Sequence, residues 1–206
     1  MTKINSSNSV MLLATKFADK GDWTVEQQFV LQMGSSYLLA HGLGSPLAKD
    51  AVTTFNIEEE GDYNLLVRTK NWTAFWSEGK TPGVFQVKVD GQTDAAEFGL
   101  GCEGATRAER AAWYWQKGGK YTFSKGKHTV ALHDLAGFDG RCDAIILTQT
   151  DCVPGDSLEE YFELRKALLG DNQPEDKGSF DFVVDRYEEV PTAVAQKIIA
   201  EAKEEE

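Results

Sequence analysis

The chain of 206 residues is long enough for one well-buried core with an appendage and too short for two ordinary domains. Its 41% hydrophobic and 26% charged residues lie near the globular average, so neither a disordered nor a membrane protein is indicated. The formal net charge of −12 repels phosphate backbones and anionic lipids, which argues against nucleic acid and membranes as partners.

The N-terminus and the cysteines give expectations about the cellular compartment. Residues 1–21 contain only a brief apolar patch, VMLLA, without the longer apolar core or cleavage site of a secretory signal. No stretch approaches membrane-spanning length. Cys102, Cys142 and Cys152 are odd in number and lack CxxC spacing, which argues against a disulfide framework and a structural zinc site and leaves one bridge open. We therefore expect a cytoplasmic protein.

Strand patterns run from about residue 8 to residue 150. Residues 61–72, GDYNLLVRTKNW, alternate so that Tyr63, Leu65 and Val67 share one face, while the other face meets solvent or a second layer. Residues 83–92 and 120–135 alternate in the same way. Asp90-Gly91 predicts a tight hairpin turn followed by a return strand. Short strands separated by Gly, Pro and Asp turns predict a sandwich or barrel over residues 8–150.

Residues 151–206 change to a helical period. Ser157 to Glu160 form a capping-box pattern before apolar residues at helical spacing, and Gly170 is a suitable stop, which predicts a helix. The polar linker DNQPEDKGS and the short strand FDFVV are expected next. A second helix is expected to begin at Pro191.

The segment HDLAGFDGRCDAIILT, residues 133–148, holds the nearest thing to an acidic cluster, Asp134, Asp139 and Asp143. The favoured interpretation is structural: Asp139-Gly140 makes a turn and Asp143 fixes a loop or an arginine. Calcium is the alternative ligand, because hard cations take carboxylate oxygens from irregular loops, although the spacing does not fit an EF-hand.

Nucleophilic catalysis has one local candidate, Cys142 beside His133. A cysteine before a buried strand is more often a small core residue than a nucleophile, so the core role is favoured. His41 is likewise interpreted as a hydrogen-bonded loop residue, since three scattered histidines offer no metal-binding helix. No catalytic residue is predicted.

Aromatic residues border two turns, in NWTAFWSEG (residues 71–79) and AAWYWQKGG (residues 111–119). Flat rings beside polar side chains suit sugar recognition, because ring faces stack on apolar C–H surfaces while polar groups bind hydroxyls. The alternative for any single tryptophan is a place in the core, and each arginine could instead anchor a carboxylate. The candidate ligand-binding residues are Trp72, Trp76, Arg68, Trp115, Arg141 and His133.

Several runs occur in an order that resembles a known module: GDW, QQF, MGSSYLLAHGLGSP, GDYNLLVRTKNWTAFW, PGVFQVKVDG, WYWQKGG and HDLAGFDGRCDAIILT. They resemble the N-terminal jelly-roll module of a bacterial FAD-dependent oxidoreductase family, which is similar to golvesin-type and carbohydrate-binding, galactose-binding-like sandwiches. The resemblance covers about residues 11–170. It implies an all-β jelly-roll β-sandwich, here with a C-terminal helical extension.

In that family a helix, an acidic linker and a strand lead into a glycine-rich dinucleotide loop. Residues 157–184 match this approach, but no glycine follows Gly178, and Asp185, Glu188 and Glu189 would repel a pyrophosphate. We therefore do not expect this chain to bind FAD. The leading hypothesis is a non-catalytic module that binds carbohydrate or packs on a partner enzyme domain. The alternative is a fragment or subunit of an FAD-dependent oxidoreductase that needs a separate dinucleotide-binding domain.

Overall fold

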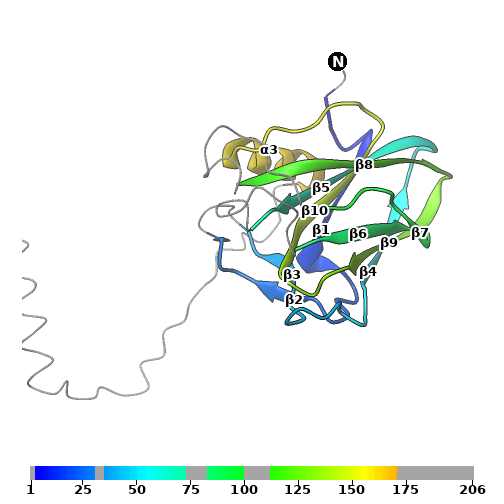
Figure 1. Ribbon diagram of the computed structural model, residues 1–206. Coiled ribbons are helices and arrows are strands. Elements are labelled where there is room, and N and C mark those ends of the chain that lie inside the picture. Colours follow the sequence, from blue (N-terminus) through cyan, green and yellow to red (C-terminus); the bar gives the residue numbers. More distant parts are fainter. Residues whose placement is uncertain (1–2, 31–34, 73–82, 100–111, 171–206) are drawn as a thin grey trace, which may run out of the picture.

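The computed structural model describes residues 3–30, 35–72, 83–99 and 112–170. Two antiparallel sheets pack face to face, and one helix covers the outer face of the larger sheet (Figure 1). The predicted all-β jelly-roll β-sandwich with a helix after it is therefore confirmed. The predicted linker, short strand and final helix after Gly170 lie outside the described residues.

The larger sheet, sheet A, has six strands among the described residues. Its order is β2-β3-β10-β5-β8, and β1 also pairs with β10. β3 pairs with the first residues of β10 and β1 with the later ones, so both lie along one edge of β10 while β5 lies along the other. The strands are β1 (Ser9–Leu13), β2 (Thr24–Glu26), β3 (Tyr37–Ala40), β5 (Gly61–Lys70), β8 (Trp113–Phe123) and β10 (Gly140–Thr148), with a 3-10 turn, η1, at Ala14–Lys16.

The smaller sheet, sheet B, has the order β4-β9-β6-β7 in the described part of the chain. Its strands are β4 (Ala51–Ile57), β6 (Phe85–Val89), β7 (Gln92–Thr93) and β9 (Gly126–Asp134). The predicted hairpin is confirmed: Asp90 and Gly91 have φ values of 47° and 79°, and β7 returns along β6. The Asp90 side chain is held by the neighbouring strand β9, where it accepts a hydrogen bond from the backbone N–H of Thr129 at 2.8 Å, and aspartate is among the residues that tolerate a positive φ in turns.

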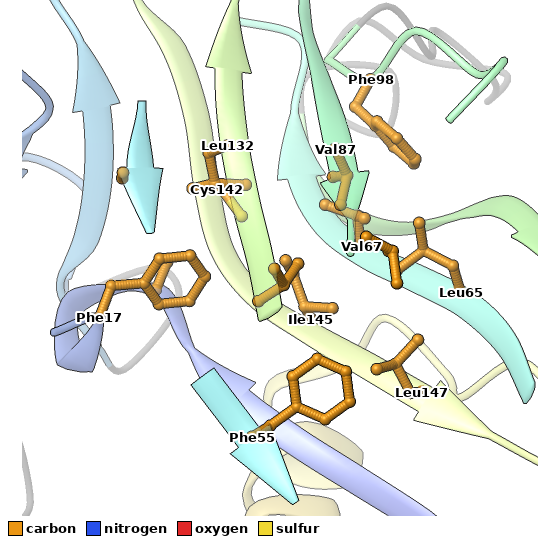
Figure 2. Packing of buried hydrophobic residues seen from close by; sticks show 14 of the residues in the cluster. Phe17, Phe55, Leu65, Val67, Val87, Phe98, Leu132, Cys142, Ile145 and Leu147 are labelled. Carbon is orange, nitrogen blue, oxygen red and sulfur yellow. The ribbon is translucent and has the colours of Figure 1, made fainter. Parts of the chain in front are cut away.

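The main core lies between the two sheets. Alternation places Leu65 of β5, Val87 of β6, Leu132 of β9 and Ile145 of β10 on the inner faces, each at most 1% exposed. Figure 2 shows these side chains gathered between the strands. Cys142 also lies in this core, where burial raises the pKa of its thiol and keeps it protonated, as the favoured interpretation of this cysteine requires.

Helix α3 (Leu158–Leu169) begins as its sequence predicts. The Ser157 hydroxyl accepts a hydrogen bond from the backbone N–H of Glu160 and donates one to its carboxylate, and Gly170 ends the helix with φ 82°. Tyr161 is fully buried against Trp115 of β8 and its neighbours on the outer face of sheet A. α3 therefore adds a third layer and shields from solvent the part of the outer face of sheet A that lies beneath it.

No helix in the described ranges has both the length and the apolar character needed to cross a membrane.

Candidate functional site

The loops at one end of the sandwich lie close together, and we call this region the loop end (residues 41–50, 71–72 and 135–139). β3 and β5 end where β10 begins, since Ala40 pairs with Gly140 and Thr69 with Cys142. The carbonyl oxygen of Gly137 accepts hydrogen bonds from the backbone N–H groups of residues 42 and 44, at 2.8 and 2.9 Å. These bonds hold two loops that are distant in sequence against each other.

An aromatic pair lies at the loop end. The rings of Trp72 and Phe138 stack with centroids 5.6 Å apart and an interplanar angle of 27°. The indole Nε1 of Trp72 donates to the Phe138 carbonyl oxygen at 3.2 Å, which fixes the tryptophan against the loop. Phe138 is 41% exposed and Trp72 is half-buried. The pair offers an apolar surface of the kind that stacks on a sugar ring.

Polar groups lie beside this pair. His41 Nδ1 is 2.6 Å from Asp139 Oδ1, and the two side chains are 52% and 23% exposed. The carbonyl oxygen of Asp139 accepts from Arg141 Nη1 at 2.7 Å. The Arg141 guanidinium carbon lies 5.5 Å from the centroid of the Trp72 ring. The loop end therefore combines exposed aromatic surface with an imidazole and a carboxylate that can bind hydroxyl groups.

Two buried cations lie next to the loop end on the outer face of sheet A. Lys70 is 6% exposed and Arg141 is 4% exposed. Their charged ends lie 4.8 and 5.4 Å from the centroid of the Phe29 ring. Burial, followed by the positive charge of Arg141, lowers the pKa of Lys70 from 10.5 to about 8. We call Lys70 and Arg141 the cation pair.

Arg68 and Trp115, both predicted to contact ligand, lie in the interior beneath α3. Arg68 Nη1 donates to Asp143 Oδ2 at 2.7 Å, and the two side chains are 2% and 1% exposed. The guanidinium carbon of Arg68 lies 3.8 Å from the centroid of the Tyr161 ring. Trp115 is 6% exposed. Their predicted ligand-binding role stays a prediction, and the proposal below does not use it.

The other candidate contact residues are scattered. His133 lies on the outer face of sheet B, where its Nδ1 is 2.7 Å from Asp50 Oδ1 and Lys88 holds the second oxygen of the same carboxylate. Trp76 lies outside the described residues. Of the six predicted contact residues, the structure brings together Trp72 and Arg141 beside the loop end, and Arg68 and Trp115, which pair across β5 and β8, beneath α3.

The three candidate calcium ligands have separate partners. Asp134 accepts from the backbone N–H groups of Leu47 and Ala136, Asp139 pairs with His41, and Asp143 pairs with Arg68. Across the described ranges no three His, Cys, Asp or Glu side chains are grouped so that they could hold a metal ion. Each of the three carboxylates fixes a loop or an arginine.

Besides His41, which was interpreted as a hydrogen-bonded loop residue, three residues of this region were not predicted as site residues. Phe138 lies at the tip of AGFDG, and an aromatic residue between turn-forming residues was a usable signal. Lys70 and Phe29 carried no such signal. Lys70 extends an alternating strand, and its burial depends on groups distant in sequence.

No protein-family model and no curated protein matches the chain. Among solved structures, a GH26-CBM35 β-(1,4)-mannanase of Podospora anserina is similar over 71% of this chain and 29% of its own length, with a TM-score of 0.50 and 17% identity. The C-terminal CBM6 of LamC from Zobellia galactanivorans is similar over 69% of this chain and 100% of its own, with a TM-score of 0.45 and 16% identity.

A family 35 carbohydrate-binding module from Clostridium thermocellum is similar over 67% of this chain and 97% of its own, with a TM-score of 0.43 and 16% identity. This chain spans less than a third of the length of the mannanase. At these identities the likeness concerns the fold. The chain belongs, by fold, among jelly-roll β-sandwiches.

Proposed function

We propose that this chain is a non-catalytic carbohydrate-binding module and that its loop end binds the sugar. The observation that carries the proposal is the stacked pair of Trp72 and Phe138. A pyranose ring presents apolar C–H groups on its face, which an exposed aromatic ring can cover. His41 and Asp139, hydrogen-bonded to each other at the edge of the pair, can exchange that bond for hydrogen bonds to sugar hydroxyls.

The contacts that hold the loop end together support the same role. The stacked rings are held by the Trp72 hydrogen bond, and the loops by the bonds to the Gly137 carbonyl. A preformed surface binds with less loss of conformational entropy than a mobile one. The fold agrees with this role, because the solved mannanase that it resembles is described as a GH26-CBM35 protein. A partner enzyme domain is therefore part of the proposal.

The test is a calorimetric titration of the purified protein with a panel of mono- and oligosaccharides. Phe138→Ala is expected to weaken binding about tenfold without lowering the melting temperature, since aromatic residues at the centre of a binding surface contribute more than about 1 kcal/mol. Phe162→Ala is the matched control, because Phe162 is 43% exposed, close to the 41% of Phe138, but lies on α3.

The proposal fails if no sugar binds or if the two variants lose the same affinity. A visible absorption spectrum of the purified protein, recorded first, distinguishes the carbohydrate-binding proposal from the oxidoreductase alternative. Bound flavin would favour an accessory part of an FAD-dependent oxidoreductase, which now rests on the resemblance of sequence motifs alone.

A further inference from the structure

The cation pair has no carboxylate partner among the described residues. Among the described residues, the carboxylate buried on this face is that of Asp143, which is occupied by Arg68 at 2.7 Å and by the hydroxyl of Ser35 at 2.9 Å. Lys88, by contrast, is half-buried on sheet B and has Asp50 at 2.7 Å. With 33 acidic residues in the chain, partners for cations are abundant, yet none of the described ones lies at the cation pair.

Two hydrogen-bond donors around the cation pair are also unsatisfied within the described part of the chain. Arg141 Nε and Trp113 Nε1 are fully buried and have no hydrogen-bond partner among the residues that the structure describes. Trp113 of β8 lies directly opposite Lys70 of β5 in the sheet register, and Arg141 lies one residue before Cys142, which pairs with Thr69. Three adjacent strands therefore bring two positive charges and at least two free N–H donors to one place.

This arrangement is costly for the folded protein alone. Two buried cations repel each other, and buried donors without acceptors lose their hydration without replacement. The Phe29 ring gives only partial compensation, because a cation–π contact is weaker than an ion pair in the same surroundings. An anion placed here would neutralise the charges and satisfy the donors together.

We propose that the cation pair binds an anionic substituent of the sugar that stacks on Trp72 and Phe138. This substituent is a carboxylate or a sulfate, and the inference rests on the proposed function. Arg141 connects the two places, since its guanidinium carbon is 5.5 Å from the Trp72 ring centroid. The half-buried Phe29 ring lies against both cations. The module therefore prefers acidic or sulfated glycans to neutral ones.

The test compares matched sugars by calorimetry: glucuronic acid with glucose, galacturonic acid with galactose, and galactose 6-sulfate with galactose. The wild type is expected to bind at least one charged sugar about tenfold or more tightly than its neutral counterpart, as charge-assisted hydrogen bonds require. Lys70→Met should remove this preference, and Lys88→Met, the control, should keep it. The two anion types separate carboxylate from sulfate recognition.

Thermal unfolding in sodium sulfate and in sodium chloride of equal ionic strength provides a second readout that needs no sugar. Sulfate stabilises proteins in general, so the measured quantity is the extra stabilisation of the wild type relative to Lys70→Met. If neutral and charged sugars bind equally, or if the preference survives in Lys70→Met, the inference is wrong while the proposed function stands. If no sugar binds, the proposed function fails, and the sulfate measurement alone decides: a Lys70-dependent gain supports the anion site, and equal gains refute it.

Discussion

Replacing Lys70 by methionine is expected to stabilise the protein at neutral pH. Methionine keeps most of the length and apolar surface of the lysine and removes a buried charge next to Arg141. The pKa of Lys70 is about 8 in the folded chain and 10.5 for an ordinary lysine. At about 1.4 kcal/mol per pH unit, this difference corresponds to about 3 kcal/mol of lost stability while the lysine is charged in both states.

The sign of the pH dependence follows from the same two pKa values. Between about pH 8 and pH 10.5 the unfolded chain binds more protons at Lys70 than the folded chain, so stability rises with pH over this window. Below it the full cost is present, and above it the cost is gone. Among the neighbours, Arg141 stays charged, Phe29 and Trp113 do not titrate, and burial raises the pKa of Tyr37.

Urea unfolding followed by tryptophan fluorescence measures this effect. The free energies of unfolding of the wild type and Lys70→Met should differ by up to about 3 kcal/mol near pH 7 and converge as the pH approaches 10.5. Lys88→Met is the control, because it removes a cation that has a carboxylate partner and should not stabilise. A Lys70→Met protein that is less stable than the wild type at pH 7, or a difference that does not change with pH, would refute the reasoning.

Three further substitutions test other parts of the structure. Asp143→Ala leaves Arg68 buried without a counter-charge and should cost about 3–5 kcal/mol in urea unfolding; a loss below about 1 kcal/mol would mean that water reaches the arginine. Ser157→Ala removes the N-cap of α3 and should cost about 1 kcal/mol, with faster hydrogen exchange in the first turn of that helix; unchanged exchange would contradict the capping role. Gly137→Ala, at φ 63° and against the facing loop, should lower both the melting temperature and the sugar affinity, whereas Gly44→Ala, which meets no neighbouring atom, should leave the packing of the loops intact; equal effects would show that the facing loop is irrelevant.

The strands and the helix could be predicted because each is encoded locally. The alternation of Phe85, Val87 and Val89 places one face of β6 in the core, and the two residues after it form the turn. The start of α3 needs only the hydroxyl of Ser157 and the Glu160 that follows it. Such signals lie within a few residues of each other, so tertiary structure is not needed to recognise them.

The candidate site was only partly predictable for a different reason. Arg68 and Trp115 look like exposed polar and aromatic positions because they alternate with core residues, but α3 covers both. The solvent exposure of a residue on the outer face of a sheet depends on whether a segment distant in sequence packs over it. Trp72 and Arg141 were predicted individually, yet the stacking of Phe138 on Trp72 depends on the meeting of two loops.

By itself the sequence determined the alternating strands, their turns, the cap of α3 and hence the class of fold, since hydrophobic period and turn chemistry are properties of neighbouring residues. Only the tertiary structure decided which of the charged and aromatic side chains are buried and which come together. Burial and proximity depend on the pairing of strands far apart in the chain. That pairing places Lys70 beside Arg141, without a carboxylate among the described residues, and it brings Trp72 against Phe138.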